Sequence, residues 1–179
     1  MLLFIIFVLL GFFLLAVQTT FFPLFPNWLG RPDLVFVLLV FVAYKFRWVL
    51  GIVTAFILGW MMDVASGMYL GTYPVTAILV FCVVKFFSQN SPVKETAFQI
   101  PLVGLSYFIV QCIFYLFFLL TQPGVLPPWS WERIVQETFI LLVAAIPCFV
   151  FYNWMYEKLL AKQLFPRAMK RRHSGNTFR

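Results

Sequence analysis

Few side chains in this sequence could carry acid, base or nucleophilic chemistry. The chain has six acidic residues and a single histidine, His173, which lies in a basic segment near the carboxyl terminus. Acid–base catalysis needs at least two titratable groups that converge, and a nucleophile needs a neighbouring base. Ser66 and Ser106 have no visible base, and Glu137 stands four residues after Arg133, a spacing that favours a simple surface pair on a helix. We therefore expect a protein that is not an enzyme.

The three cysteines give no sign of redox or metal chemistry. Cys82, Cys112 and Cys148 all lie inside apolar runs, without C-x-x-C spacing and without a histidine partner. Disulfide frameworks and metal sites carry such spacing. We expect no metal, no cofactor and no disulfide.

Asp63 is the most conspicuous acidic residue, because it lies near the end of an otherwise apolar segment. A carboxylate at membrane depth is costly and usually faces the interior of a helix bundle. Residues 64–71 include three that suit a helix end and a glycine-dependent turn: Ser66, Gly67 and Gly71. We expect Asp63 to hold this turn by accepting backbone N–H bonds. A pair with Arg31, for which Asp33 competes, is an alternative, and catalysis is a third.

Small residues recur at every fourth position of the segment that precedes this turn. Gly51, Ala55 and Gly59 are followed on the same spacing by Asp63 and Gly67. Small side chains at this spacing allow another helix to approach closely. The partner is either a neighbouring segment of the same chain, which is the simpler interpretation, or the helix of another protein.

The elements that must position these residues are membrane helices. Of the 179 residues, 63% are hydrophobic and only 11% are charged, whereas soluble domains have about 25% charged residues. The apolar runs are long enough to cross a bilayer core as helices of roughly 20 residues. We predict an all-α membrane protein, a six-transmembrane-helix bundle. The expected segments are 2–22, 32–44, 48–65, 73–87, 100–120 and 134–156, with a helical turn near Ser91 and Pro92 before the fifth and a kink at Pro147 in the sixth.

The basic residues predict the orientation. With the amino terminus inside, the cytoplasmic stretches contain eleven of the thirteen basic residues, and only Arg31 and Arg133 lie outside. This asymmetry follows the positive-inside rule. Residues 1–157 are expected to form the transmembrane domain and residues 158–179 a basic cytoplasmic tail. Such a tail next to a membrane is attracted to anionic lipid, so we expect no nucleic-acid partner.

Three stretches of the chain carry a family resemblance: Arg31-Pro32-Asp33-Leu34, the helix with Gly51 and Gly59, and Asp63-x-x-Ser66-Gly67-x-x-Leu70-Gly71. In these stretches the chain resembles the MreD family, bacterial rod-shape-determining membrane proteins. It implies a non-catalytic subunit of the peptidoglycan machinery of cell elongation, in the inner membrane. It also implies binding to MreC and, directly or through it, an influence on the elongation transpeptidase (a class B penicillin-binding protein), RodA and the MreB filament.

The same resemblance implies an alternative function. The MreD family is similar in fold to the substrate-binding (S) subunits of energy-coupling-factor vitamin transporters, which bind small molecules for uptake. Those subunits dock on their partner through small residues in the first helix, where this chain has only Gly11 and Ala16. A vitamin site also needs several inward polar groups, and the sequence has few, among them Gln111 and Asn153. We therefore expect the scaffold function over the transport function.

Overall fold

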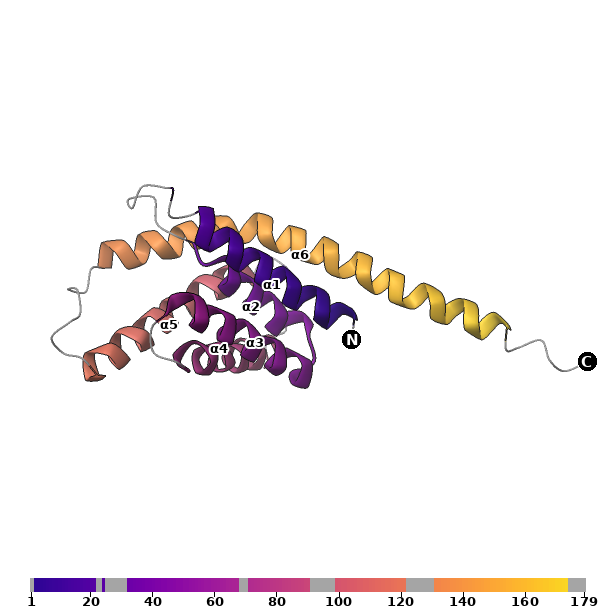
Figure 1. Ribbon diagram of the computed structural model, residues 1–179, viewed down its shortest axis with the longest axis horizontal. Coiled ribbons are helices and arrows are strands. Elements are labelled where there is room, and N and C mark those ends of the chain that lie inside the picture. Colours follow the sequence, from indigo (N-terminus) through magenta and orange to yellow (C-terminus); the bar gives the residue numbers. More distant parts are fainter. Residues whose placement is uncertain are drawn as a thin grey trace, which may run out of the picture.

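The computed structural model describes residues 2–21, 24, 32–67, 71–90, 99–121 and 131–173. Its regular elements over these ranges are six α-helices (Figure 1). Their bounds are α1 Leu2–Phe21, α2 Leu34–Lys45, α3 Trp48–Ser66, α4 Thr72–Asn90, α5 Gln99–Thr121 and α6 Trp131–His173. The described part of the chain is thus all-α, as its composition predicts.

Four of these helices include stretches long and apolar enough to cross a membrane: Leu3–Phe21, Trp48–Ser66, Thr72–Gln89 and Ile134–Ala161. Two further apolar stretches, Leu34–Lys45 and Ile100–Leu116, are shorter. A bilayer core of about 30 Å needs roughly 20 helical residues. The protein therefore has the character of a multi-pass membrane protein.

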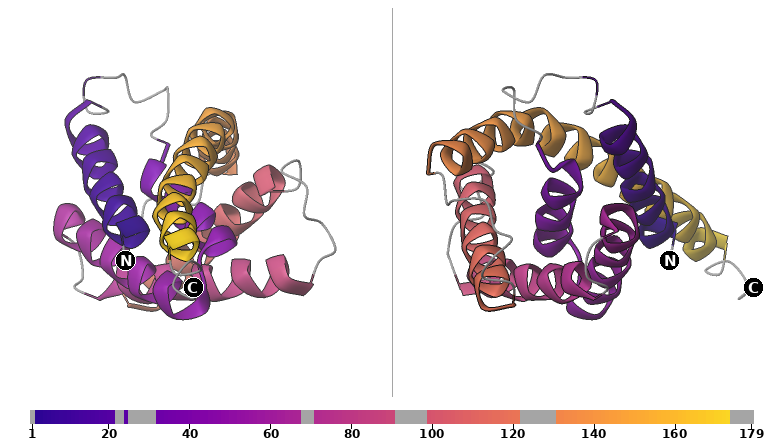
Figure 2. Two further views of the ribbon diagram at one scale, coloured as in Figure 1. Left: turned by 90° about the vertical axis from the view of Figure 1, so that its right-hand side faces the viewer. Right: turned by 60° about the vertical axis from the view of Figure 1, so that its left-hand side comes forward.

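Helix α2 lies inside a ring formed by the other five helices and packs against each of them (Figure 2). Nine consecutive residues, Val35 to Ala43, are buried on every side of this helix. A helix that is apolar all round belongs in the core of a bundle or in lipid, and here the core encloses it. At 12 residues, α2 is about 18 Å long, shorter than the bilayer core.

Aromatic rings join α2 to the helices on either side of it. The ring of Phe41 in α2 stacks on Phe7 of α1 with 5.7 Å between centroids, and it meets Phe149 and Tyr152 of α6 edge to face. Such pairs stabilise by about 0.5–1.5 kcal/mol beyond the area that they bury. They fix α1 and α6 on the same central helix.

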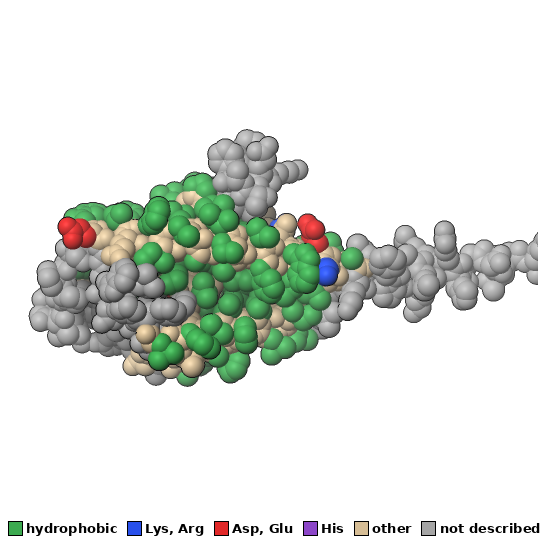
Figure 3. Space-filling view, turned by 90° about the horizontal axis from the view of Figure 1, so that it is seen from above, with side chains coloured by type: hydrophobic (Ala, Val, Ile, Leu, Met, Phe, Trp, Pro, Cys, Tyr) green, Lys and Arg blue, Asp and Glu red, His purple; other side chains and the backbone are tan. Residues whose placement is uncertain are grey.

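The face over α1 and α6 is covered mainly by hydrophobic side chains, with charged ones near its ends (Figure 3). Leu9, Phe13 and Val150 are each more than 60% exposed. A continuous exposed apolar surface of this kind marks a membrane-interaction surface.

Helix α6 is longer than the sequence predicts. The sixth segment was expected to end near Tyr156, but the helix continues through Pro147 and the start of the basic tail to His173 (Figure 1). Most residues that follow Tyr156 are strong helix formers such as Leu, Ala, Lys and Arg. Its 43 residues correspond to about 64 Å, roughly twice the thickness of a bilayer core. The expected turn at Ser91 and Pro92 lies outside the described residues.

Candidate functional site

The Asp63 carboxylate connects the end of α3 to the start of α4. Its Oδ2 atom accepts the backbone N–H of Gly71 at 2.6 Å, and its Oδ1 atom accepts that of Tyr73 at 3.4 Å. Asp63 is only 5% exposed, so these N–H groups take the place of water. This is the geometry expected for a carboxylate that holds the turn.

Two glycines give the turn its backbone conformation. Gly67 has φ +62° and ends α3, with its N–H donated to the carbonyl of Asp63, and Gly71 has φ +97° just before α4. Positive φ is readily adopted by glycine and costs other residues energy. The Ser66 hydroxyl donates to the same Asp63 carbonyl at 3.0 Å. Ser66, Gly67 and Gly71 therefore belong to one helix-ending unit with Asp63.

Asp33 begins α2. Its Oδ1 atom accepts the backbone N–H of Phe36 at 3.0 Å, which is the bond of a helix N-cap. Burial raises the pKa of the Asp33 carboxyl, while the bonds from Phe36 and from the side chain of Gln18 act to lower it. Pro32 lies partly buried before this cap. Arg31 lies outside the described residues, so its pairing with Asp63 stays a prediction.

The two acidic residues lie at the same end of the bundle. Both Asp33 and Asp63 act electrostatically on the hydroxyl of Tyr73, in the first turn of α4. Asp33 caps α2 and Asp63 bonds to the start of α4, so each carboxylate is engaged by backbone N–H groups of this chain. The segments that carry the motif residues therefore meet at one place, although they are 30 residues apart in sequence.

The small-residue stripe of α3 faces α4. A Cβ atom on Gly59 would lie 2.6 Å from the Cα atom of Pro74, and a Cβ atom on Gly51 would overlap the ring of Phe81. Gly51, Ala55 and Gly59 are all buried. The close approach that these residues allow is occupied by α4 of the same chain. Gly11 of α1 likewise points inward, toward Leu58, whereas Ala16 is exposed.

Lys85 has a role that the sequence did not reveal. Its Nζ atom donates to the carbonyl of Phe46, at the end of α2, over 2.6 Å, and the side chain is only 7% exposed. A cation at a helix C-terminus satisfies a carbonyl and opposes the negative end of the helix dipole. The only signal in the sequence is a lone lysine within an apolar run, and it is one of the eleven basic residues that the predicted topology places on the cytoplasmic side.

No known protein family, curated protein or solved structure matches this chain.

The four buried polar or charged side chains of the described residues bond to backbone groups of the helices and turns. They are Thr54, Asp63, Lys85 and Ser106. Thr54 and Ser106 donate to carbonyls of their own helices at 2.7 and 2.9 Å, and the other two bond to turns or helix ends. Within the same residues no group of three or more His, Cys, Asp or Glu side chains is arranged to hold a metal ion.

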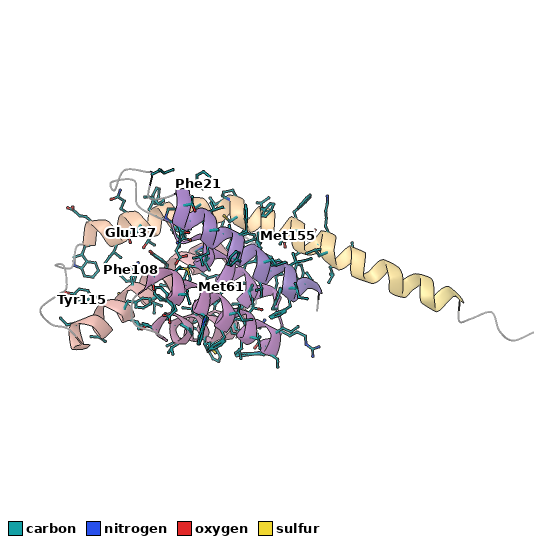
Figure 4. All side chains as sticks on the ribbon, viewed as in Figure 1. Phe21, Met61, Phe108, Tyr115, Glu137 and Met155 are labelled. Atoms are coloured by element: carbon teal, nitrogen blue, oxygen red, sulfur yellow. The ribbon has the colours of Figure 1, made fainter. Side chains whose placement is uncertain are left out.

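A second polar group lies between α5 and α6. Gln111 donates to the hydroxyl of Tyr107 at 2.7 Å, and Glu137 acts electrostatically on the same hydroxyl. Figure 4 places Glu137 and Met155 toward opposite ends of the part of α6 that packs on the bundle. Glu137 therefore lies on the same side of the bundle as Asp33, which also acts on Tyr107.

Proposed function

We propose that this protein is a non-catalytic scaffold of the cell-elongation peptidoglycan synthesis complex, similar to MreD and located in the bacterial inner membrane. Both termini face the cytoplasm in this proposal. The multi-pass character of the chain and the asymmetry of its basic residues support the location and the orientation.

The observation that carries the proposal is the α3–α4 hairpin. The residues on which the resemblance rests within this hairpin act together: Gly51 and Gly59 bring the two helices into contact, and Asp63, Ser66, Gly67 and Gly71 close the turn. The carboxylate at the centre of the motif bonds two backbone N–H groups and so stabilises the shape of the hairpin. A scaffold needs such a motif to keep the hairpin rigid within the membrane.

The proposed partners follow from the resemblance. The chain binds MreC, and through it or directly it influences the elongation transpeptidase, RodA and MreB. The basic residues after Tyr156 interact with anionic lipid and not with nucleic acid. Helix α6 carries the first of them beyond the other helices (Figure 1), on the cytoplasmic side in this topology.

Co-purification tests this function directly. The tagged protein is expressed at native level in its own bacterium, extracted in a mild detergent, and its companions are identified by mass spectrometry. We expect MreC in amounts comparable to the bait, with other elongation proteins at lower levels. An unrelated six-helix membrane protein with the same tag controls for non-specific capture. Recovery of a transporter ATPase module in place of MreC would contradict the scaffold and favour vitamin uptake.

A further inference from the structure

We draw no further inference here: the strongest candidate, the polar cluster of Asp33, Asp63, Tyr73 and Tyr107 at the end of the bundle where α2 begins, belongs to the site already described, and both of its carboxylates already accept backbone N–H groups of this chain.

Discussion

The Asp63 carboxylate holds the backbone N–H of Gly71 at 2.6 Å, eight residues further along the chain. The same group reaches Tyr73 in the first turn of α4. One side chain thus fixes the length of the turn and the starting point of the next helix. Because the carboxylate is buried, its loss leaves two N–H groups without water to replace it.

Asp63→Ala should therefore destabilise the protein by about 1–3 kcal/mol, and Asp63→Asn by less, because the amide keeps one oxygen acceptor. The free energy of unfolding in detergent measures both. If Arg31 also pairs with Asp63, Arg31→Ala should add little to Asp63→Ala, as for contacting residues. Equal stability of the alanine variant and the wild type would rule out a role in the turn.

Gly59→Ala should destabilise the hairpin, and Gly59→Leu should do so more strongly. The added Cβ atom would lie 2.6 Å from the backbone of Pro74, and backbone does not move aside cheaply. Overpacking of this kind costs about 1–3 kcal/mol or more. Ala65→Leu is the matched control, because Ala65 is an exposed residue of the same helix. The thermal unfolding temperature should fall for the glycine variants only. An equal fall for Ala65→Leu would show that α3 tolerates no larger side chain at either position.

Lys85→Met should lower stability by about 1–3 kcal/mol, because the Phe46 carbonyl loses its donor at the end of α2. Methionine keeps the length and the apolar stem of the side chain, so the change isolates the ammonium. Lys158→Met removes an exposed cation and should have little effect. The comparison is made by chemical unfolding in detergent, and equal losses from the two variants would contradict the capping role.

Asp33 should make stability depend on pH. Burial raises its folded-state pKa above the ordinary value of 3.8, so as pH falls the folded protein takes up the proton before the unfolded chain does. This group's contribution to the free energy of unfolding therefore decreases as pH rises from about 4 through the folded-state pKa, and it is constant above. Asp33→Asn keeps the N-cap and removes the titration. As pH rises across that window, the free energy of unfolding of the wild type should fall relative to that of Asp33→Asn. Parallel pH profiles of the two proteins would contradict this prediction.

Reporter fusions test the orientation. Fusions after Ser91 and after Arg179 should be active as cytoplasmic reporters, and a fusion after Pro128 should be active as a periplasmic one. The expectation follows from the eleven basic residues that this topology places inside. A periplasmic carboxyl terminus would contradict the topology.

Most helix boundaries could be predicted because local signals set them. Pro23 and Pro26 follow α1, Arg47 precedes α3, and the glycines after Asp63 end that helix. The bonds of Asp63 could also be anticipated, since both partners lie within ten residues of it. Proline, glycine and charge act over one or two turns, so the sequence displays their effect directly.

The position of α2 could not be predicted in the same way. Val35 to Ala43 are uniformly apolar, and uniform apolarity suits both the lipid and the protein interior. The bond from Lys85 to Phe46 joins residues 39 positions apart, a distance over which no local pattern operates. The end of α6 was also missed, because a change from apolar to basic residues marks the edge of a membrane and not the end of a helix.

The enclosure of α2 has a consequence for biosynthesis. Phe149 and Tyr152, which cover Phe41 on one flank of α2, belong to α6, which leaves the ribosome after the five other described helices. Until α6 is made, that flank of α2 faces lipid or a chaperone, and a helix of about 18 Å does not reach across the bilayer by itself. The native arrangement of the five earlier helices is therefore completed only after α6 has been made and has packed against α2.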